Sequence, residues 1–210
     1  MVADSKYTIE NIIFSRFELI SSLALSKYKL SKEDNTLIYG LGNIGITTLV
    51  YLLDKGVKKI DICVKENQLN YKKVSEILSE VYSAEINILY KVNDYKNYNV
   101  FIDATGSNDV IQKIIDECNY HSKLIIVSTP RDEFKNFSFA KVCRKNLNII
   151  GAHEFNGIKS VDRQKQYNNL LKQNVNKDYL HLFINFHDYS EKKLSEIYKI
   201  KTNFIDSFKY

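Results

Sequence analysis

The sequence predicts an α/β protein with a doubly wound, mostly parallel six-stranded sheet and helices on both of its faces. Two observations predict this fold. Short apolar runs alternate with segments of helical periodicity through the middle of the chain, and a glycine-rich turn joins the first apolar run to a helix. In such a sheet, a ligand binds outside the carboxyl ends of the strands.

The charge and hydropathy of the chain exclude several classes of protein. The net charge of +5 comes from lysines spread along the whole sequence, which is more typical of a solvated surface than of a nucleic-acid interface. No apolar run approaches the roughly 20 residues of a membrane span, and the first residues lack the core of a signal peptide. We therefore expect a cytoplasmic protein that binds neither nucleic acid nor membrane.

The glycine-rich turn lies within residues 35–45, where a buried strand is followed by Gly40-x-Gly42-x-x-Gly45 and then by a helix at 46–55. This is the spacing of a dinucleotide-binding (Rossmann) turn. Gly40 permits the sharp turn, Gly42 allows close approach of a pyrophosphate, and Gly45 lets the helix lie close to the strand. The helix directs free N–H groups at the two negative charges.

The elements at the start of the chain have clear signals. Residues 7–30 carry apolar side chains at helical spacing, and a helix is expected to begin near Ser15 after a short helical or irregular lead. The first strand, at 36–40, is a short apolar run after a polar turn. The helix at 46–55 is followed by Gly56, a common residue just past a helix end.

The same alternation continues through the rest of the sheet. Further strands are expected at 59–64, 86–90, 99–104, 123–128 and 147–151. A helix at 71–82 has one apolar face, and a helix at 110–119 has Ser107 or Asn108 available as a cap. The end of the chain is less regular, with a helix at 161–173, a possible strand at 180–186, an amphipathic helix at 190–200 and a terminal strand or docked tail at 203–208.

These elements predict three regions. Residues 1–35 form a helical lead, 36–158 a dinucleotide-binding domain, and 159–210 a helical extension packed on the same domain. No linker is evident between these regions, and the sequence shows no internal repeat.

The cysteines and histidines do not form a metal site. The three cysteines, Cys63, Cys118 and Cys143, are widely spaced and are expected to be reduced thiols. The four histidines show no pair at the spacing of zinc ligands. We therefore expect no bound metal.

Several segments resemble, in order and spacing, the nucleotide-binding half of medium-chain dehydrogenases of the zinc alcohol dehydrogenase type. These segments are residues 37–45, 99–106, 124–130 and 148–152, and the similarity extends over about residues 14–155. The resemblance implies a domain that binds NADP or NAD, and hydride transfer with a small alcohol or carbonyl substrate.

The resembled family carries a catalytic domain ahead of this half, and the residues before the strand at 36–40 are too few to form one. The resemblance therefore implies that catalytic zinc is absent and that a partner subunit or a reduced mechanism supplies the substrate chemistry. Because the sheets of two subunits join edge to edge in that family, it also implies a homodimer through residues 147–155.

The expected cofactor contacts follow the carboxyl ends of the strands. The pyrophosphate is expected along Gly40, Leu41, Gly42, Asn43, Ile44 and Gly45. By resemblance, the nicotinamide ribose lies near Ala104, Thr105 and Gly106. By resemblance, the carboxamide meets backbone groups of Val127, Ser128, Thr129 and Ala152.

His153 and Glu154 follow these groups at the mouth of the pocket, and His153 is the catalytic candidate. If the sixth strand ends at Gly151, the imidazole lies at the mouth of the nicotinamide pocket, where it could exchange a proton. The simpler alternative is a loop histidine that is hydrogen-bonded to backbone.

The end of the second strand decides between NADP and NAD. An NAD site usually has an acid there that binds the ribose 2′-hydroxyl, whereas this chain has Val64 or Lys65. A lysine favours a 2′-phosphate and hence NADP. Glu66 could still serve NAD if the strand ends one residue later, and an ordinary solvated lysine is the simplest alternative.

Three functions are compatible with this pattern. The first is an oxidoreductase, or the nucleotide-binding subunit of one. The second is a module that binds and senses NAD(P) without turnover. The third is a domain for another nucleotide, such as S-adenosylmethionine, although such turns rarely hold all three glycines at this spacing.

Overall fold

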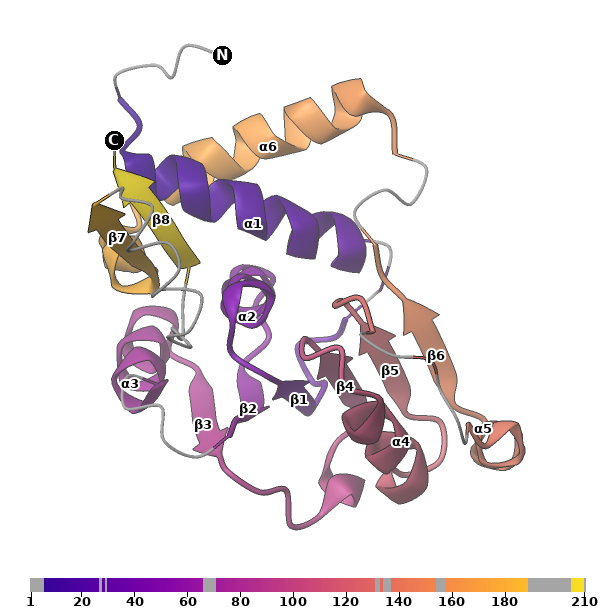
Figure 1. Cartoon of the computed structure of the whole chain (residues 1–210). Helices are drawn as coiled ribbons and strands as arrows, with labels where there is room; N and C mark the ends of the chain where they lie inside the picture. Colours follow the sequence, from indigo (N-terminus) through magenta and orange to yellow (C-terminus); the bar gives the residue numbers. More distant parts are fainter. Residues whose placement is uncertain are drawn as a thin grey trace.

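The computed structural model describes residues 6–26, 28, 30–65, 71–130, 133, 137–153, 158–188 and 205–209. A six-stranded, all-parallel sheet with the order β3-β2-β1-β4-β5-β6 forms its centre (Figure 1). The strands are β1 (Thr36–Tyr39), β2 (Lys59–Cys63), β3 (Glu85–Leu89), β4 (Val100–Asp103), β5 (Lys123–Ile126) and β6 (Asn148–Gly151). The predicted doubly wound α/β sheet is confirmed, with β1 at its middle.

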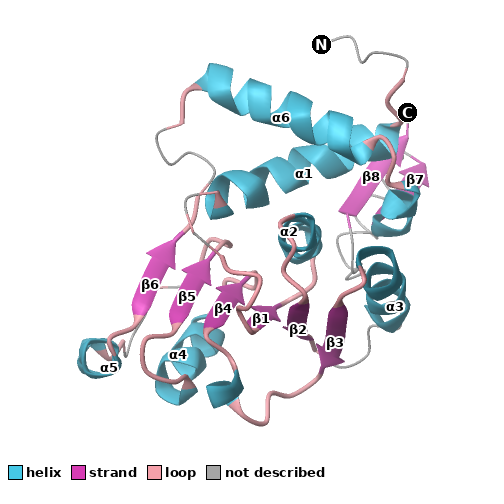
Figure 2. Ribbon diagram, turned by 180° about the vertical axis from the view of Figure 1, so that it is seen from behind, coloured by secondary structure: helices cyan, strands magenta, loops and turns pink. Residues whose placement is uncertain are grey.

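Helices cover both faces of the sheet. Helices α2 (Asn43–Asp54) and α3 (Tyr71–Tyr82) lie on one face and α4 (Asn108–Glu117) on the other (Figures 1 and 2). Successive side chains of β1 point to opposite faces of the sheet. Ile38 joins the core under α2, while Leu37 joins the core under α4. The predicted strands are correct to within about one or two residues, but α2 begins three residues before the expected 46.

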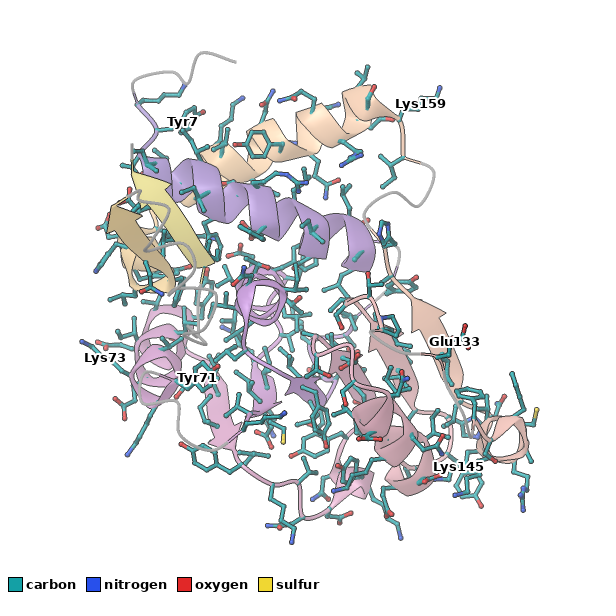
Figure 3. The ribbon with its side chains drawn as sticks, in the orientation of Figure 1. Tyr7, Tyr71, Lys73, Glu133, Lys145 and Lys159 are labelled. Atoms are coloured by element: carbon teal, nitrogen blue, oxygen red, sulfur yellow. The ribbon has the colours of Figure 1, made fainter. Side chains whose placement is uncertain are left out.

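A short helix, α5 (Phe139–Lys145), was not predicted, because none of its residues is buried and it carries no apolar stripe. Its last residue, Lys145, reaches the carboxyl end of α4 (Figure 3). There its Nζ donates hydrogen bonds to the carbonyl oxygens of Ile115 (3.1 Å), Asp116 (2.7 Å) and Cys118 (2.8 Å). The ammonium group thus supplies donors to carbonyls that the helix itself leaves unpaired.

The connection from β3 to β4 contains only one 3₁₀ turn, η1 (Tyr95–Asn97), in place of a crossover helix. Aromatic rings cover the sheet at this point. Tyr39 stacks on Tyr95 with ring centroids 6.4 Å apart, Tyr95 stacks on Phe101 at 6.2 Å, and Tyr98 meets Phe101 edge-on at 6.0 Å. The hydroxyl groups of Tyr39 and Tyr95 are hydrogen-bonded.

Beyond these rings, the same face of β2 and β3 is polar and open to solvent. Lys59, Glu85 and Asn87 are exposed there, and the Asn87 amide donates to Asp61 at 2.8 Å. The alternation of these residues with buried isoleucines is typical of a sheet covered on one side only.

A second helical layer lies over α2 (Figure 2), formed by α1 (Ile9–Leu25) and α6 (Ser160–Asn174). The expected start of α1 at Ser15 is wrong. Thr8 Oγ1 accepts from the Asn11 backbone N–H at 3.2 Å, and Asn11 Oδ1 accepts from the Thr8 N–H at 3.0 Å. This capping box fixes the helix start two turns earlier.

The chain after α6 continues as η2 (Asp178–Phe183) and β7 (Ile184–Asp188), which pairs in parallel with β8 (Ile205–Lys209). The strand predicted at 180–186 therefore begins later, because its first residues form a 3₁₀ turn. The terminal strand predicted at 203–208 is confirmed, and the amphipathic helix predicted at 190–200 lies outside the described residues. In the part of the chain that the structure describes, no helix is long and apolar enough to cross a bilayer.

Candidate functional site

The carboxyl ends of all six strands meet at one edge of the sheet, because every strand pair is parallel. At the centre of this edge β1 lies between β2 and β4, and the order of the strands along the chain reverses at this point. A crevice forms at such a reversal because the loops on its two sides lead away in opposite directions. The glycine turn follows β1 directly and therefore occupies this position.

Two of the three glycines are required by the backbone, Gly40 by its positive φ and Gly45 by a close contact. Gly40 has φ +87°, and a β-carbon there would lie 2.8 Å from Thr105 Cγ2. A β-carbon on Gly45 would lie only 2.1 Å from the Gly40 carbonyl oxygen. The predicted close approach of helix to strand at Gly45 is confirmed.

Gly42 has a different environment. It is exposed, and a β-carbon built on it would meet no atom of the described residues within 4 Å. It is also the N-cap of α2, and no side chain of the described residues caps the helix there. No contact among the described residues requires a glycine here, whereas a diphosphate on the first N–H groups of α2 would, so the residues present fit a dinucleotide.

Around the turn, Asn43 and Ile44 are half-buried in the first turn of α2, while Leu41 is fully buried in the core. Leu41 can therefore offer a ligand only its backbone. On the far side, the hydroxyl of Ser21 from α1 donates to the Ile44 carbonyl oxygen at 3.4 Å and bonds with the Thr47 hydroxyl at 2.9 Å. Helix α1 is thus tied to the helix that carries the turn.

The loop after β4 is organised by Asp103. Its buried carboxylate accepts hydrogen bonds from the Thr105 hydroxyl (2.5 Å), the Thr105 N–H (3.0 Å), the Gly106 N–H (3.2 Å) and the Ser128 hydroxyl (3.3 Å). Burial raises the pKa of Asp103, and these hydrogen bonds oppose that shift. Asp103 thus braces the loop after β4.

The loops after β4 and β5 touch each other. A β-carbon on Gly106, which has φ +66°, would lie 2.5 Å from the Thr129 carbonyl oxygen. Ala104 and Thr105 are half-buried in the first of these loops. Of the second loop, Val127 is buried, Ser128 half-buried and Thr129 exposed. The structure therefore gathers the residues after β1, β4 and β5 into one continuous rim.

Ala152 and His153 extend the rim at β6. The Ala152 N–H donates to the Ile126 carbonyl oxygen at 2.9 Å, and the next residue, His153, is exposed. Glu154, beside it in the sequence, lies outside the described residues.

The opposite end of the rim is at β2. The Gly40 N–H donates to the Cys63 carbonyl oxygen at 2.9 Å, so the end of β2 lies directly beside the glycine turn. Lys65 follows two residues later and is exposed. The acidic alternative, Glu66, lies outside the described residues.

Metal ligands do not gather among the described residues, where no three His, Cys, Asp or Glu side chains come together as an ion would require. Cys63, Cys118 and Cys143 are free thiols. Two neighbours of the site were not predicted. They are Ser21, which contacts the turn, and Tyr28, whose hydroxyl donates to the Gly151 carbonyl oxygen at 3.4 Å. Neither has a local sequence signal, because each acts across a long stretch of chain.

The strand order and the turn after the central strand define the class of the protein as a Rossmann fold. Several solved structures share this fold with the chain. The chain is similar to benzyl alcohol dehydrogenase from Acinetobacter calcoaceticus, with a TM-score of 0.71 and 16% identity over 100% of this chain and 58% of that one. It is similar to L-idonate 5-dehydrogenase from Escherichia coli, with a TM-score of 0.74 and 13% identity over 99% and 59% of the two chains.

A third similar structure is S. aureus TarJ in complex with NADPH, with a TM-score of 0.64 and 15% identity over 97% and 65% of the two chains. The chain thus has the fold of the nucleotide-binding domain of medium-chain zinc alcohol dehydrogenases, and it spans less than two thirds of each of these matched chains. No protein-family model and no curated protein matches the sequence.

Proposed function

We propose that this protein binds NADP or NAD at the rim of the sheet and acts as an oxidoreductase, or as the nucleotide-binding subunit of one. Its substrate would be a small alcohol or carbonyl compound. The observation that carries the proposal is Gly42, an exposed glycine that no packing requires, at the uncapped start of α2 beside the central strand.

The residues that would hold the cofactor have separate roles. The backbone N–H groups of Asn43, Ile44 and Gly45 would bind the diphosphate, because they lie in the first turn of α2. Thr105 and Thr129 would flank the second nucleotide, because they lie in adjoining loops after β4 and β5. These two halves of the site match the two mononucleotide-binding halves of the fold.

Lys65 supports NADP over NAD. It is exposed just beyond the end of β2, where an ammonium group would neutralise a 2′-phosphate. The NADPH complex of TarJ is compatible with that preference.

His153 is the proposed group for proton exchange. When bound, a nicotinamide cofactor supplies or accepts hydride, and the proton must pass through another group. The exposed imidazole of His153 lies one residue beyond the buried Ala152 at the end of β6. A ring nitrogen there would hold or release the proton of a substrate hydroxyl.

Cofactor binding is tested by melting the purified protein with NADPH, NADH and S-adenosylmethionine. A ligand at about 100 times its dissociation constant stabilises the fold by roughly 2.7 kcal/mol, which is a measurable rise in melting temperature. Stabilisation by NADPH supports the proposal. The proposal would be contradicted if neither NADPH nor NADH changed the melting temperature while S-adenosylmethionine raised it.

A binding or sensing module is the second candidate. Turnover of NADPH with a panel of aldehydes separates the two, because a sensor binds the cofactor without consuming it.

A homodimer through the edge of β6 is part of the proposal. Asn148 and Ala152 donate to β5, so the alternate residues Ile149 and Gly151 direct their backbone groups away from it. Tyr28 meets the Gly151 carbonyl oxygen on that outer side. The outer groups of Ile149 would then pair with a second copy of the chain.

A further inference from the structure

A buried polar cluster joins α1, α2 and α6 on the side of the fold away from the rim. Its centre is Glu18 of α1, which has no exposed surface. Glu18 Oε2 accepts a hydrogen bond from Asn174 Nδ2 of α6 at 2.6 Å, and the same amide nitrogen also donates to Ser15 Oγ at 2.9 Å. A carboxyl group is rarely buried so completely unless its charge is paired or neutralised.

The charged neighbours of Glu18 are Lys177 and Asp54, the last residue of α2. Asp54 Oδ2 accepts from Lys177 Nζ at 2.6 Å, and Asp54 Oδ1 accepts from the Tyr82 hydroxyl at 2.8 Å. Tyr82 is in turn bonded to the Tyr179 hydroxyl at 2.6 Å. The Lys177 ammonium group and the Tyr82 hydroxyl therefore both donate hydrogen bonds to Asp54, and both stabilise its negative charge.

The second oxygen of Glu18 is unsatisfied. Glu18 Oε1 is buried and has no hydrogen-bond donor among the described residues. The Asp54 carboxylate interacts with the Glu18 carboxyl group, as do the charge of Lys177 and the amide of Asn174. Two ionised carboxylates cannot hydrogen-bond to each other, but a proton on Glu18 would turn this orphaned oxygen into a donor toward Asp54.

The electrostatic environment favours that protonated form. Burial raises the pKa of Glu18 from 4.5 to about 7, and the negative charge of Asp54 acts in the same direction, while Lys177 and the Asn174 hydrogen bond oppose the shift. Among the described residues, the other titratable groups that face Glu18 are the hydroxyls of Tyr51 and Tyr179, which remain neutral in this range because burial raises the pKa of both.

We propose that Glu18 carries a proton toward Asp54 in the folded protein, and that loss of this proton weakens the attachment of α1 and α6 to α2. The resulting hydrogen bond from Glu18 to Asp54 would join the helical layer to the Rossmann domain. Because the folded state binds the proton more tightly than the unfolded state, the stability that it gives is present at low pH. That stability is lost as the pH rises from about 4.5 to about 7.

The test is urea unfolding of the full chain and of Glu18→Gln between pH 5 and pH 8. The wild-type unfolding constant should rise about seventyfold more over this range than that of the variant, because up to one proton is released on unfolding. The glutamine side chain has the shape of a protonated glutamate, so the variant should also be the more stable protein at pH 8. Equal pH dependence in both proteins would overturn the proposal.

Glu76→Gln is the matched control, because Glu76 is an exposed glutamate on α3 and should leave the wild-type pH dependence unchanged. If Glu18→Gln does not fold, infrared spectroscopy of the wild-type protein decides the question. A protonated carboxyl band at pH 6 that disappears by pH 8 while the protein stays folded supports the proposal. Its absence at pH 6 would overturn it.

Discussion

The carbonyl oxygen of Gly40 lies 2.1 Å from the position that a β-carbon on Gly45 would occupy. A side chain at position 45 would force α2 away from the end of β1. We predict that Gly45→Ala lowers the free energy of unfolding by about 1–3 kcal/mol through overpacking. Urea denaturation measures this loss, and an unchanged denaturation midpoint would contradict the described contact.

Gly42→Ala is the matched variant, and it should impair cofactor binding while leaving the stability of the fold nearly unchanged. Gly42 has φ −79° and open space around its α-carbon, so alanine should change stability by less than about 1 kcal/mol. It should nevertheless abolish the melting-temperature rise with NADPH, because the new methyl group occupies the place proposed for the diphosphate. A variant that kept its NADPH response would refute the site.

Lys65 is predicted to set the cofactor preference. Lys65→Ala should weaken NADPH binding about tenfold, or about 1.4 kcal/mol, and leave NADH binding nearly unchanged, since only NADPH carries the 2′-phosphate. Lys59→Ala is the control, because Lys59 is equally exposed but at the opposite end of β2. Titration by nucleotide fluorescence measures both, and equal losses for the two cofactors would argue against this role.

Lys145 is predicted to hold α4 in place. Lys145→Met should cost about 2 kcal/mol, because it removes charge-assisted hydrogen bonds to the carbonyl oxygens of Ile115, Asp116 and Cys118. Lys141→Met removes a bridge to Asp116 in which the lysine side chain is 44% exposed, and should cost less than about 1 kcal/mol. Thermal unfolding compares the two variants. Equal losses of stability would show that the contacts to the carbonyl oxygens do not stabilise the fold.

The edge of β6 is predicted to mediate dimerisation. Ile149→Pro removes an outward N–H without breaking the β5–β6 ladder, and should shift the protein toward the monomer in sedimentation velocity. Tyr28→Phe, which frees the Gly151 carbonyl oxygen at the same edge, should leave the dimer intact. A wild-type protein that is monomeric at all concentrations would end this proposal.

The sequence was sufficient to predict the six strands and the turn because both have short-range signals. Apolar runs fix the strands, and the spacing of Gly40, Gly42 and Gly45 fixes the turn. The start of α1 was misplaced because its capping box uses an asparagine, Asn11, where glutamate or glutamine is usual.

Contacts between distant segments could not be predicted. Glu18 and Asn174 are separated by 156 positions, and Tyr28 and Gly151 by 123. No periodicity encodes such pairs, because each depends on how whole helices are placed on the sheet. The bracing role of Asp103 has a local signal, since two of its partners, Thr105 and Gly106, lie two and three residues ahead.

The single 3₁₀ turn between β3 and β4 leaves one side of β2 and β3 without a helix, so these strands are sealed from water on one face only. Their backbone amides should exchange with deuterium sooner than those of β1 and β4, which are enclosed on both faces. Heating should therefore fray the sheet from β3 inward. The Lys65 side of the rim would then lose its shape before the β4–β5 side does.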